Sequence, residues 1–419
     1  MRSTRLPFLH SLLVLIAVAA APLPARADQA PSSAVATAAA DFDEAWRIVR
    51  DRFYDRGMHG LDWDAVGAKY RQAAAAATGE RAVAEAINAM LAELKASHLG
   101  YYTRQDTAYY DLADIFSRSL RDRLKPVFSG GEVAYTGIGI FTRRIEDKTF
   151  VSGVLDGLPA DKAGLRVGDE ILAVDGAPFE PIDSFADKSG RKVTLDIRRT
   201  RDGAPRQLDV VPRRIEPNET YLEAMRASSR IIDHAGVKIG YIHVWSYARG
   251  SYQELLEQQI SNGPLKDADA LIWDLRDGWG GADPAYLDIF NARAPTMLTT
   301  GRGGDRSVVN ARWRRPAALL INGGTRSGKE VLTYGFKKYG YGEVVGTRTA
   351  GALLAGRAFL LSGGGLLLVP VADVSVDGER LEERGVTPTI EVARDIPYAA
   401  GADPQLDRAV AELVRSVGG

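Results

Sequence analysis

Hydrophobic positions along this chain change their spacing twice, and each change marks a different kind of structure. Between Phe42 and Phe53, apolar residues recur every three or four positions, which is the spacing of an amphipathic helix. Similar helical patterns cover residues 63–76 and 81–94. We therefore expect a small N-terminal helical domain over residues 41–128.

From about Val133 the apolar positions alternate, as in half-buried β-strands, and this pattern continues to about Arg213. From about residue 237 onward, short apolar runs alternate with helical patterns, which is typical of an α/β domain. We expect a β domain over residues 129–213 and an α/β domain over 214–419, so that the fold class is α/β multidomain. The strands expected in the last domain lie at 237–246, 270–275, 317–321 and 343–346, and the helices at 252–260, 284–290, 330–339 and 404–417.

The N-terminus has the pattern of a secretory signal peptide. Two arginines, Arg2 and Arg5, precede an apolar run at 12–21, and small residues flank a cleavage point near Ala27. We expect residues 1–27 to be removed on export to the periplasm or outside the cell, and 28–40 to form an Ala/Pro/Ser linker. The alternative is an uncleaved membrane anchor. No later segment has the length and apolar character of a membrane span, so none is expected in the mature chain.

Composition excludes several classes of function. The chain has no cysteine, so thiolate nucleophiles, thiolate metal sites and disulfides are impossible. Its net charge is −1 and it has no strong basic run, which disfavours nucleic-acid binding. Its five histidines lack ligand spacing, so we expect neither a metal site nor a cofactor.

The turn from Asn322 to Glu330 is the strongest candidate for chemistry. An apolar strand precedes this glycine-rich segment, a helical pattern follows it, and Ser327 lies where the helix begins. A helix N-terminus presents unpaired N–H groups and the positive end of the helix dipole. Such a turn suits either a bound phosphate or the oxyanion that develops when a serine attacks a carbonyl.

The phosphate hypothesis fails at one necessary position. Residues 323–329 match the start of a Walker A loop, but Glu330 stands where a serine or threonine would hold magnesium. A carboxylate there would repel a triphosphate. We therefore interpret Ser327 as a candidate nucleophile.

A serine nucleophile needs a base, and histidine can take and return a proton near neutral pH. Lys329 is only two residues from Ser327 and would point to a different face of the helix. His98, preceded by Ser97, is the better candidate by type, although a lone histidine at a helix end can also be a cap or a packed residue. Two further motifs fit a catalytic site: the turn at 274–281, which ends in the adjacent glycines Gly280 and Gly281, and the carboxylate of Glu382. Their alternatives are an ordinary tight turn and a solvated glutamate.

The segment 129–213 resembles a PDZ domain of bacterial proteases. The stretch Gly137, Ile138, Gly139 and Ile140 is similar to the loop that binds a peptide carboxylate, and residues 163–172 are similar to the helix–turn–strand core of that domain. Exposed amides in such a loop and a free strand edge can hold an extended peptide. The alternative is a module that only packs against its neighbour.

Together these motifs resemble the serine peptidase family that contains the C-terminal processing peptidases, the tricorn protease core and the interphotoreceptor retinoid-binding protein repeats. The C-terminal processing peptidases pair their serine with a lysine about twenty-five residues later, and Ala352 stands at that position here. The tricorn-like branch uses a Ser-His pair ahead of the PDZ domain and a glutamate near the C-terminus, which Ser97, His98 and Glu382 match. This resemblance implies an α/β peptidase core.

The resemblance also implies roles for these residues. Ser327 would attack the carbonyl, His98 would act as base and then acid, and Ser97 and Glu382 would orient the histidine. The N–H of Gly328, with that of Gly280 or Gly281, would hold the oxyanion.

One departure affects the expected activity: Gly278 replaces the asparagine that this family usually carries in the turn at 274–281, which could loosen the turn. We expect an exported serine peptidase that cleaves extended or unfolded polypeptides, with cleavage from C-terminal tails as one form of this activity. The alternatives are a catalytically weak peptide-binding or scaffolding protein on the same fold and a hydrolase of small esters.

Overall fold

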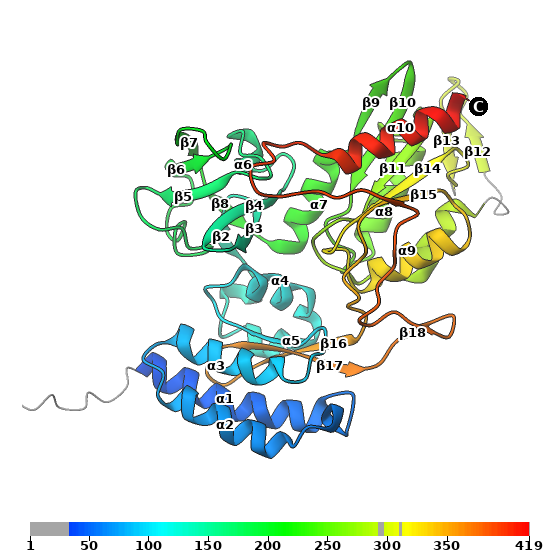
Figure 1. Cartoon of the computed structure of the whole chain (residues 1–419). Helices are drawn as coiled ribbons and strands as arrows, with labels where there is room; N and C mark the ends of the chain where they lie inside the picture. Colours follow the sequence, from blue (N-terminus) through cyan, green and yellow to red (C-terminus); the bar gives the residue numbers. More distant parts are fainter. Residues whose placement is uncertain (1–32, 292–296, 310–311, 419) are drawn as a thin grey trace, which may run out of the picture.

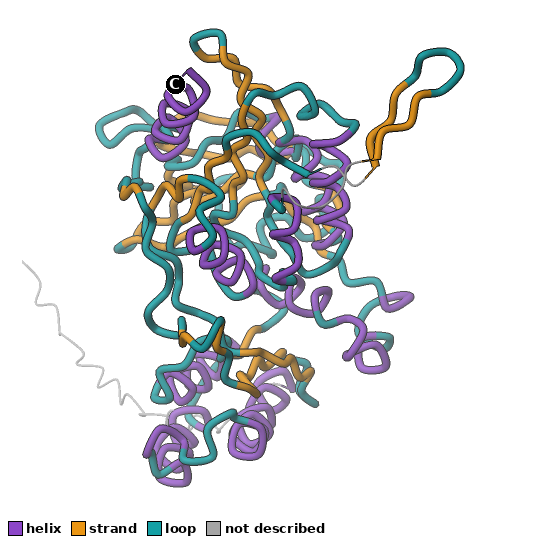
Figure 2. The backbone as a smooth tube through the Cα atoms, turned by 90° about the vertical axis from the view of Figure 1, so that its right-hand side faces the viewer, coloured by secondary structure: helices purple, strands orange, loops and turns teal. Residues whose placement is uncertain are grey.

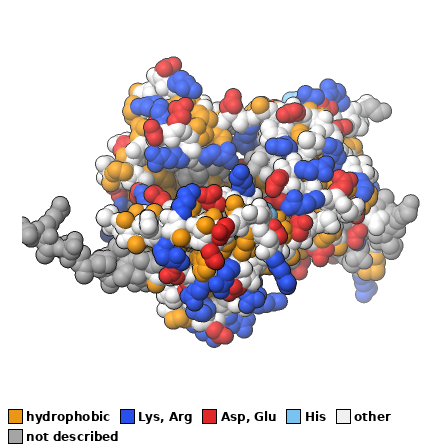
Figure 3. Space-filling model, turned by 60° about the horizontal axis from the view of Figure 1, so that its bottom comes forward, with side chains coloured by type: hydrophobic (Ala, Val, Ile, Leu, Met, Phe, Trp, Pro, Cys, Tyr) orange, Lys and Arg blue, Asp and Glu red, His pale blue; other side chains and the backbone are white. Residues whose placement is uncertain are grey.

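The structure is a computed structural model that describes residues 33–291, 297–309 and 312–418. Its α/β multidomain class, with N-terminal helices, a PDZ-like β domain and an α/β core, is confirmed (Figure 1). The predicted signal peptide lies outside the described residues. Among the described helices, none combines the length and the apolar character that crossing a bilayer requires. Figure 3 shows Lys and Arg interspersed with Asp and Glu over one face of the molecule.

The N-terminal region is built from three helices that share one apolar core. Helix α1 starts inside the stretch 28–40 that the sequence predicts as a linker. Asp62 caps the N-terminus of α2 by accepting the N–H of Ala65, as an N-cap aspartate typically does. The elements here are α1 (Ser33–Arg52), η1 (Met58–Gly60), α2 (Trp63–Ala75), α3 (Glu80–Ala92), β1 (Gly100–Tyr102), α4 (Thr107–Ile115), α5 (Ser117–Leu124) and η2 (Ser129–Gly131).

A hairpin from the C-terminal half of the chain completes this N-terminal region. Strands β16 (Ala355–Leu360) and β17 (Leu366–Ala372) form a three-stranded sheet with β1, in the order β1-β17-β16. Asp41 of α1 accepts hydrogen bonds from the amides of Gly363 and Gly365 in the hairpin turn. Figure 1 shows the two orange strands beside the blue helices. The predicted domain boundaries assign β16 and β17 to the α/β domain, so they do not reveal that this hairpin pairs with β1 in the N-terminal region.

The β domain is a five-stranded antiparallel sheet with a short helix, and a small two-stranded sheet, β2 with β8, joins it to its neighbours. Gly139 has φ +81°, and a side chain there would meet Leu158 at 2.7 Å, so this loop requires glycine. Strand β3 forms one edge of the sheet, whose order is β3-β4-β5-β6-β7. The elements are β2 (Tyr135–Gly137), β3 (Ile140–Ile145), β4 (Lys148–Val154), α6 (Pro159–Lys162), β5 (Glu170–Val174), β6 (Val193–Arg198), β7 (Arg206–Val210) and β8 (Arg213–Ile215).

The α/β core has a six-stranded sheet in the order β20-β15-β14-β11-β10-β9, parallel except for the β9–β10 pair. Both faces of the central strands are buried, which explains their continuous apolar runs. The hairpin of β12 and β13 projects from the core (Figure 2). The elements are α7 (Pro217–Ser228), β9 (Arg230–His234), β10 (Val237–His243), α8 (Ser251–Ser261), β11 (Ala270–Asp274), η3 (Pro284–Phe290), β12 (Met297–Thr300), β13 (Arg306–Val309), β14 (Ala317–Ile321), α9 (Gly328–Lys338), β15 (Glu343–Gly346), β18 (Ser375–Val376), β19 (Glu379–Arg380), β20 (Ile390–Glu391) and α10 (Pro404–Gly418).

Candidate active site

Ser327 occupies a strained backbone position between β14 and α9. Its φ is +57° and its ψ is −132°, a conformation that a non-glycine residue rarely adopts and that costs about 1–3 kcal/mol. The Ser327 N–H donates to the carbonyl of Ala352 at 2.8 Å and to Glu330 Oε2 at 3.2 Å. These bonds hold the strained turn, and the side chain is only half-buried. The sequence predicts this turn but not its strain.

Glu330 ties the serine turn to the loop 349–354. Its side chain is fully buried, and burial raises its pKa even though hydrogen bonds to it act in the opposite direction. Besides the Ser327 N–H, its carboxylate accepts the Thr349 hydroxyl at 2.6 Å and the amides of Gly351 and Ala352, both at 2.8 Å. Ala352, which stands where related peptidases carry a lysine, therefore contributes backbone groups to the site.

A second buried glutamate, Glu382, lies on the other side of the same loop. It is 3% exposed, so it is not solvated. It accepts the Ser97 N–H at 3.0 Å and the Ser97 hydroxyl at 2.9 Å. The amides of Leu353 and Leu354 donate to it as well, at 2.6 and 3.1 Å. The structure thus brings Glu382 to Ser97 from a position 285 residues away.

Hydrogen bonding determines which nitrogen of His98 carries the proton. Ser97 Oγ lies 3.0 Å from His98 Nδ1 and donates its single proton to Glu382. The Ser97 oxygen must then accept, so Nδ1 of a neutral His98 carries the hydrogen. This tautomer leaves Nε2 with a lone pair, as a general base requires.

His98 is held in its neutral form. Burial lowers its pKa to about 3, and the positive charge of Arg326 contributes to the shift. The backbone at His98 has φ +51°, so this position is constrained as well. His98 therefore makes specific contacts and is more than a packed helix end.

The loop that follows Ala352 connects His98 with Ser327. The Ala352 carbonyl accepts the Ser327 N–H, and four residues later Gly356 lies against His98, where a side chain would meet the imidazole Cδ2 at 3.2 Å. In the described structure, no hydrogen bond joins the imidazole to the Ser327 hydroxyl. Catalytic hydrogen bonds are often long without substrate and tighten in the complex.

Of the three glycines predicted for an oxyanion site, two lie directly against Ser327. A side chain on Gly280 would meet the Ser327 Cβ at 2.5 Å and the Gly328 amide nitrogen at 3.1 Å. Gly328 itself packs against the backbone of Ala282, where a side chain would come within 2.3 Å of its nitrogen. Gly281, with φ +100°, packs instead against the backbone at Tyr247 and Ala248. The geometry favours Gly280 over Gly281 as the partner of Gly328.

Backbone contacts and Lys329 hold the turn at 274–281, in which Gly278 stands where the family usually has an asparagine. Gly278 has φ +70°, and a side chain there would lie 1.9 Å from the Trp245 carbonyl oxygen. That carbonyl accepts the N–H of Trp279 at 2.8 Å, and Lys329 Nζ donates to the Asp277 carbonyl at 2.8 Å. Lys329 is fully buried, and burial lowers its pKa to about 7. The sequence does not predict this role of Lys329, because no local pattern signals a contact between residues 329 and 277.

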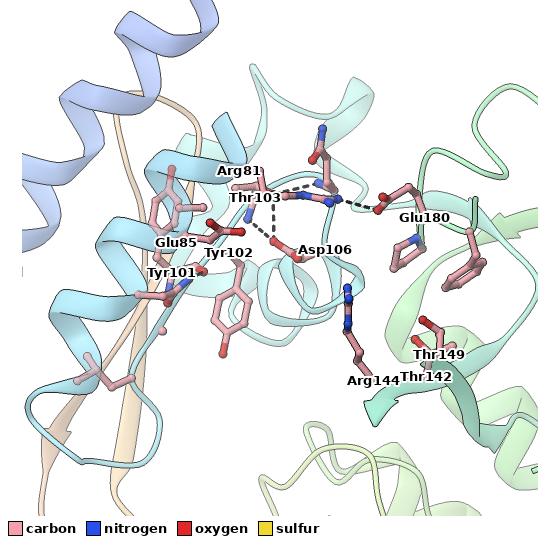
Figure 4. A pocket seen from close by; sticks show the side chains of 17 residues that line it. Arg81, Glu85, Tyr101, Tyr102, Thr103, Asp106, Thr142, Arg144, Thr149 and Glu180 are labelled. Atoms are coloured by element: carbon pink, nitrogen blue, oxygen red, sulfur yellow. Dashed lines mark hydrogen bonds and ion pairs between the residues drawn. The ribbon is translucent and has the colours of Figure 1, made fainter. Parts of the chain in front are cut away.

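A cleft of about 830 Å³ lies between the N-terminal region and the β domain, and Leu99, the residue after His98, is part of its lining (Figure 4). Arg81 of α3 reaches across it to Glu180 at 2.7 Å. The outward edge of β1 is closed, because the Asn88 amide pairs with both the N–H and the carbonyl of Tyr101. A smaller cavity of about 80 Å³, bordered by the loop 137–140, adjoins the cleft. The two cavities share Thr142, Phe179 and Pro181.

Three family models match successive parts of the chain. Residues 34–92 match the tricorn protease C1 domain, 150–199 a PDZ domain and 238–392 peptidase family S41. The chain is 25% identical to the chloroplastic carboxyl-terminal-processing peptidase 3 of Arabidopsis thaliana over 83% of this chain and 67% of that protein. It is 26% identical to tricorn protease homolog 1 of Streptomyces coelicolor over 88% of this chain, but this match spans only 34% of that longer protein.

Two solved structures share the fold. A photosystem II D1 C-terminal processing protease aligns with 93% of this chain and 98% of its own, with a TM-score of 0.51 and 21% identity. The tricorn protease aligns with 92% of this chain and 37% of its own, with the same TM-score and 19% identity. The order of helices, β domain and α/β core is therefore common to all three.

Proposed function

Because this chain belongs to peptidase family S41, we propose that it is an exported serine peptidase that cleaves extended or unfolded polypeptides, with Ser327 as nucleophile. The observation that carries the proposal is the hydrogen-bonded chain from Glu382 through Ser97 to His98, at a site that also holds the strained Ser327. Structures built only to pack rarely retain such strain together with buried polar relays.

In the proposed reaction, His98 Nε2 takes the proton of the Ser327 hydroxyl while Oγ attacks the carbonyl carbon of the scissile peptide bond. The carbonyl oxygen becomes an oxyanion that accepts the N–H groups of Gly328 and Gly280. The C–N bond then breaks, and His98 returns the proton to the departing amine. Water releases the acyl group by the same steps in reverse order.

Ser97 and Glu382 act on His98 without touching the substrate. When His98 becomes positively charged, its burial makes that charge costly, as its low pKa indicates. The negative charge of Glu382, transmitted through the Ser97 hydroxyl, offsets part of this cost. In the free enzyme the low pKa keeps the base unprotonated over the whole neutral range.

The cleft suits an extended chain that arrives from the β domain. We propose that the loop of Gly137, Ile138, Gly139 and Ile140 holds a terminal carboxylate and that the polypeptide continues through the cleft toward His98. The two adjoining cavities support this path. The leader predicted at residues 1–27 would place this activity outside the cytoplasm.

A fluorophosphonate that reacts with activated serines tests the proposal directly. We expect labelling of Ser327 in the folded wild type, its complete loss in Ser327→Ala, and a strong reduction in His98→Ala. Mass spectrometry identifies the labelled residue, and circular dichroism confirms that the variants fold. A wild type that binds unfolded polypeptide without being labelled would instead establish the scaffolding alternative. Turnover of a simple ester without any cleavage of peptides would favour the small-ester alternative.

A further inference from the structure

Arg326, the residue before the proposed nucleophile, carries a charge that the described structure does not balance. Its guanidinium stacks on the ring of Trp279 at 5.3 Å. Within the described ranges it donates no hydrogen bond and forms no ion pair. Other arginines near the site are neutralised: Arg276, for example, pairs with Asp274 and Asp403. Arg326 is only half-buried, so its charge remains accessible.

The position of this charge is central to the site. Trp279, on which Arg326 stacks, belongs to the turn that packs against Ser327 through Gly280. The positive charge of Arg326 also contributes to the lowered pKa of His98. Arg326 thus lies next to the nucleophile in the chain and against the turn that carries Gly280.

An unpaired cation at this point disfavours catalysis by the free enzyme. His98 must become positively charged during the reaction, and a neighbouring positive charge opposes that step. A substrate group that neutralises the cation would remove this opposition. The guanidinium is planar and can form two parallel hydrogen bonds with a carboxylate, which makes a carboxylate the matching group.

We propose that Arg326 binds an acidic side chain of the substrate close to the scissile bond. This inference rests on the proposed function of Ser327 and names the substrate class that the site selects. Binding of that carboxylate couples recognition to activation of the base, because it cancels the charge that opposes protonation of His98. A peptide without such a group would leave the charge of Arg326 in place, so protonation of His98 would remain opposed.

Cleavage of a defined peptide in three chemical forms tests the proposal. A pool of peptides from digested, denatured proteins first reveals a preferred cleavage site by mass spectrometry. That peptide is then synthesised in its native form, with an amidated C-terminus, and with Asn or Gln in place of nearby Asp or Glu. For the wild type we expect the native form to exceed the Asn/Gln form in kcat/KM by about ten- to hundredfold. Loss of activity in the amidated form alone would place the recognised carboxylate at the C-terminus and would overturn the proposal.

Two substitutions separate recognition from general damage. In Arg326→Gln the ratio between native and neutral peptides should fall to near one. Arg357→Gln is the matched control, because Arg357 is also an arginine over an aromatic ring, at 5.5 Å from Phe359, and Arg326 is the arginine whose charge contributes to the His98 pKa shift. This control should keep the wild-type ratio. A wild-type ratio near one, or a ratio that survives in Arg326→Gln, would overturn the proposal.

Failure of the proposed function gives a different result. If the fluorophosphonate leaves wild-type Ser327 unlabelled, the nucleophile assignment fails while the role of Arg326 stays testable by binding. The full-length Ser327→Ala chain should then bind a pool of synthetic acidic peptides at least about tenfold more tightly than the same pool with Asn and Gln in place of Asp and Glu. Addition of Arg326→Gln should remove this difference, and equal binding of both pools would overturn the inference.

Discussion

The two buried glutamates of the site, Glu330 and Glu382, have the same bonding pattern but different origins. Each accepts hydrogen bonds from two successive amides of one loop. Gly351 and Ala352 donate to Glu330, and Leu353 and Leu354 donate to Glu382. Each also accepts from the serine that it supports, Ser327 or Ser97. Glu330 is local to its serine, three residues away, whereas Glu382 is 285 residues from Ser97.

This difference separates two tasks. Glu330 is the third residue of helix α9, which begins directly after Ser327. It therefore shapes the backbone of Ser327 within one short segment. Glu382 joins two ends of the chain and places its negative charge one hydroxyl away from His98. We therefore expect loss of Glu330 to act mainly on stability and loss of the Glu382 charge to act mainly on catalysis. The loop 349–354 couples the two halves, because both carboxylates depend on its amides.

The largest expected effect comes from removing either reacting group. Ser327→Ala and His98→Ala should each lower kcat/KM by about 10⁴-fold, roughly 5.5 kcal/mol of transition-state stabilisation. The double variant should lose little more than either single variant, because the two residues act as a unit. Steady-state kinetics on one peptide measures all three. Additive losses would show that His98 acts independently of Ser327.

Removing the local carboxylate should cost the most stability. Glu330→Ala leaves the Thr349 hydroxyl and the amides of Gly351 and Ala352 without an acceptor, so we expect a loss of about 3–4 kcal/mol in the free energy of unfolding. Denaturant unfolding measures it, with the exposed Glu254→Ala as the control that should change stability by less than about 0.5 kcal/mol. A stable Glu330→Ala protein with wild-type activity would contradict the structural role of this carboxylate.

Neutralising the distant carboxylate should instead reduce turnover. Glu382→Gln preserves shape but removes the charge that stabilises protonated His98, so kcat should fall by about 10²-fold, roughly 2.7 kcal/mol. KM should change little, because Glu382 does not touch the substrate. Glu330→Gln provides the comparison. If kcat falls more in Glu330→Gln than in Glu382→Gln, then Glu330 and not Glu382 is the carboxylate that acts mainly on catalysis.

Restoring the family's usual asparagine should damage the turn. The backbone at Gly278 has φ +70°, and a side chain would lie 1.9 Å from the Trp245 carbonyl. Gly278→Asn should therefore lower the free energy of unfolding by about 2 kcal/mol and should not raise activity. Thermal unfolding and peptide kinetics check this expectation. A more active Gly278→Asn enzyme would mean that the missing asparagine does limit the wild type.

The smallest effect concerns pH. Because burial lowers the pKa of His98 to about 3, the base stays neutral, and kcat/KM should change by less than about twofold between pH 7 and 5. The unfolded chain takes up a proton below about pH 6.5. The stabilising contribution of neutral His98 is thus complete above that pH and is lost as the pH falls toward 3.

Two controls isolate the histidine. The difference in unfolding free energy between wild type and His98→Ala should shrink across this acidic range if the imidazole is responsible. In Arg326→Gln the pKa of His98 should rise, which moves the acidic limb of the rate profile to higher pH. A wild-type rate that falls sharply near pH 6.5 would indicate an imidazole with an ordinary pKa.

Local patterns in the sequence predict the elements of the core well. The expected strands at 317–321 and 343–346 coincide with β14 and β15, because continuous apolar runs mark strands buried on both faces. The segment 284–290 is a 3₁₀ helix where an ordinary helix was expected. It is a short turn, capped by Asp283 and opened by a proline, and seven residues are too few for helical periodicity to be distinctive.

Contacts between distant segments were the part that local patterns could not predict. The pairing of β1 with β17 and the packing of Leu367 and Val369 against the N-terminal helices leave no signal in either segment alone. Likewise, the sequence predicts only that Lys329 points to a different face of the helix from Ser327, whereas its contact with Asp277 requires knowledge of which turn lies opposite. The proximity of Ser97 and Glu382 was predictable only through resemblance to a family.

The long separation between Ser97 and Glu382 has a consequence for biosynthesis. A nascent chain that has not yet reached residue 382 has no carboxylate to place beside Ser97, and β1 has no partner until residues 366–368 exist. Synthesis therefore completes nearly the whole polypeptide before the relay can assemble. This order of events would protect the producing cell from an active peptidase during translation. A chain truncated at residue 381 should accordingly resist fluorophosphonate labelling.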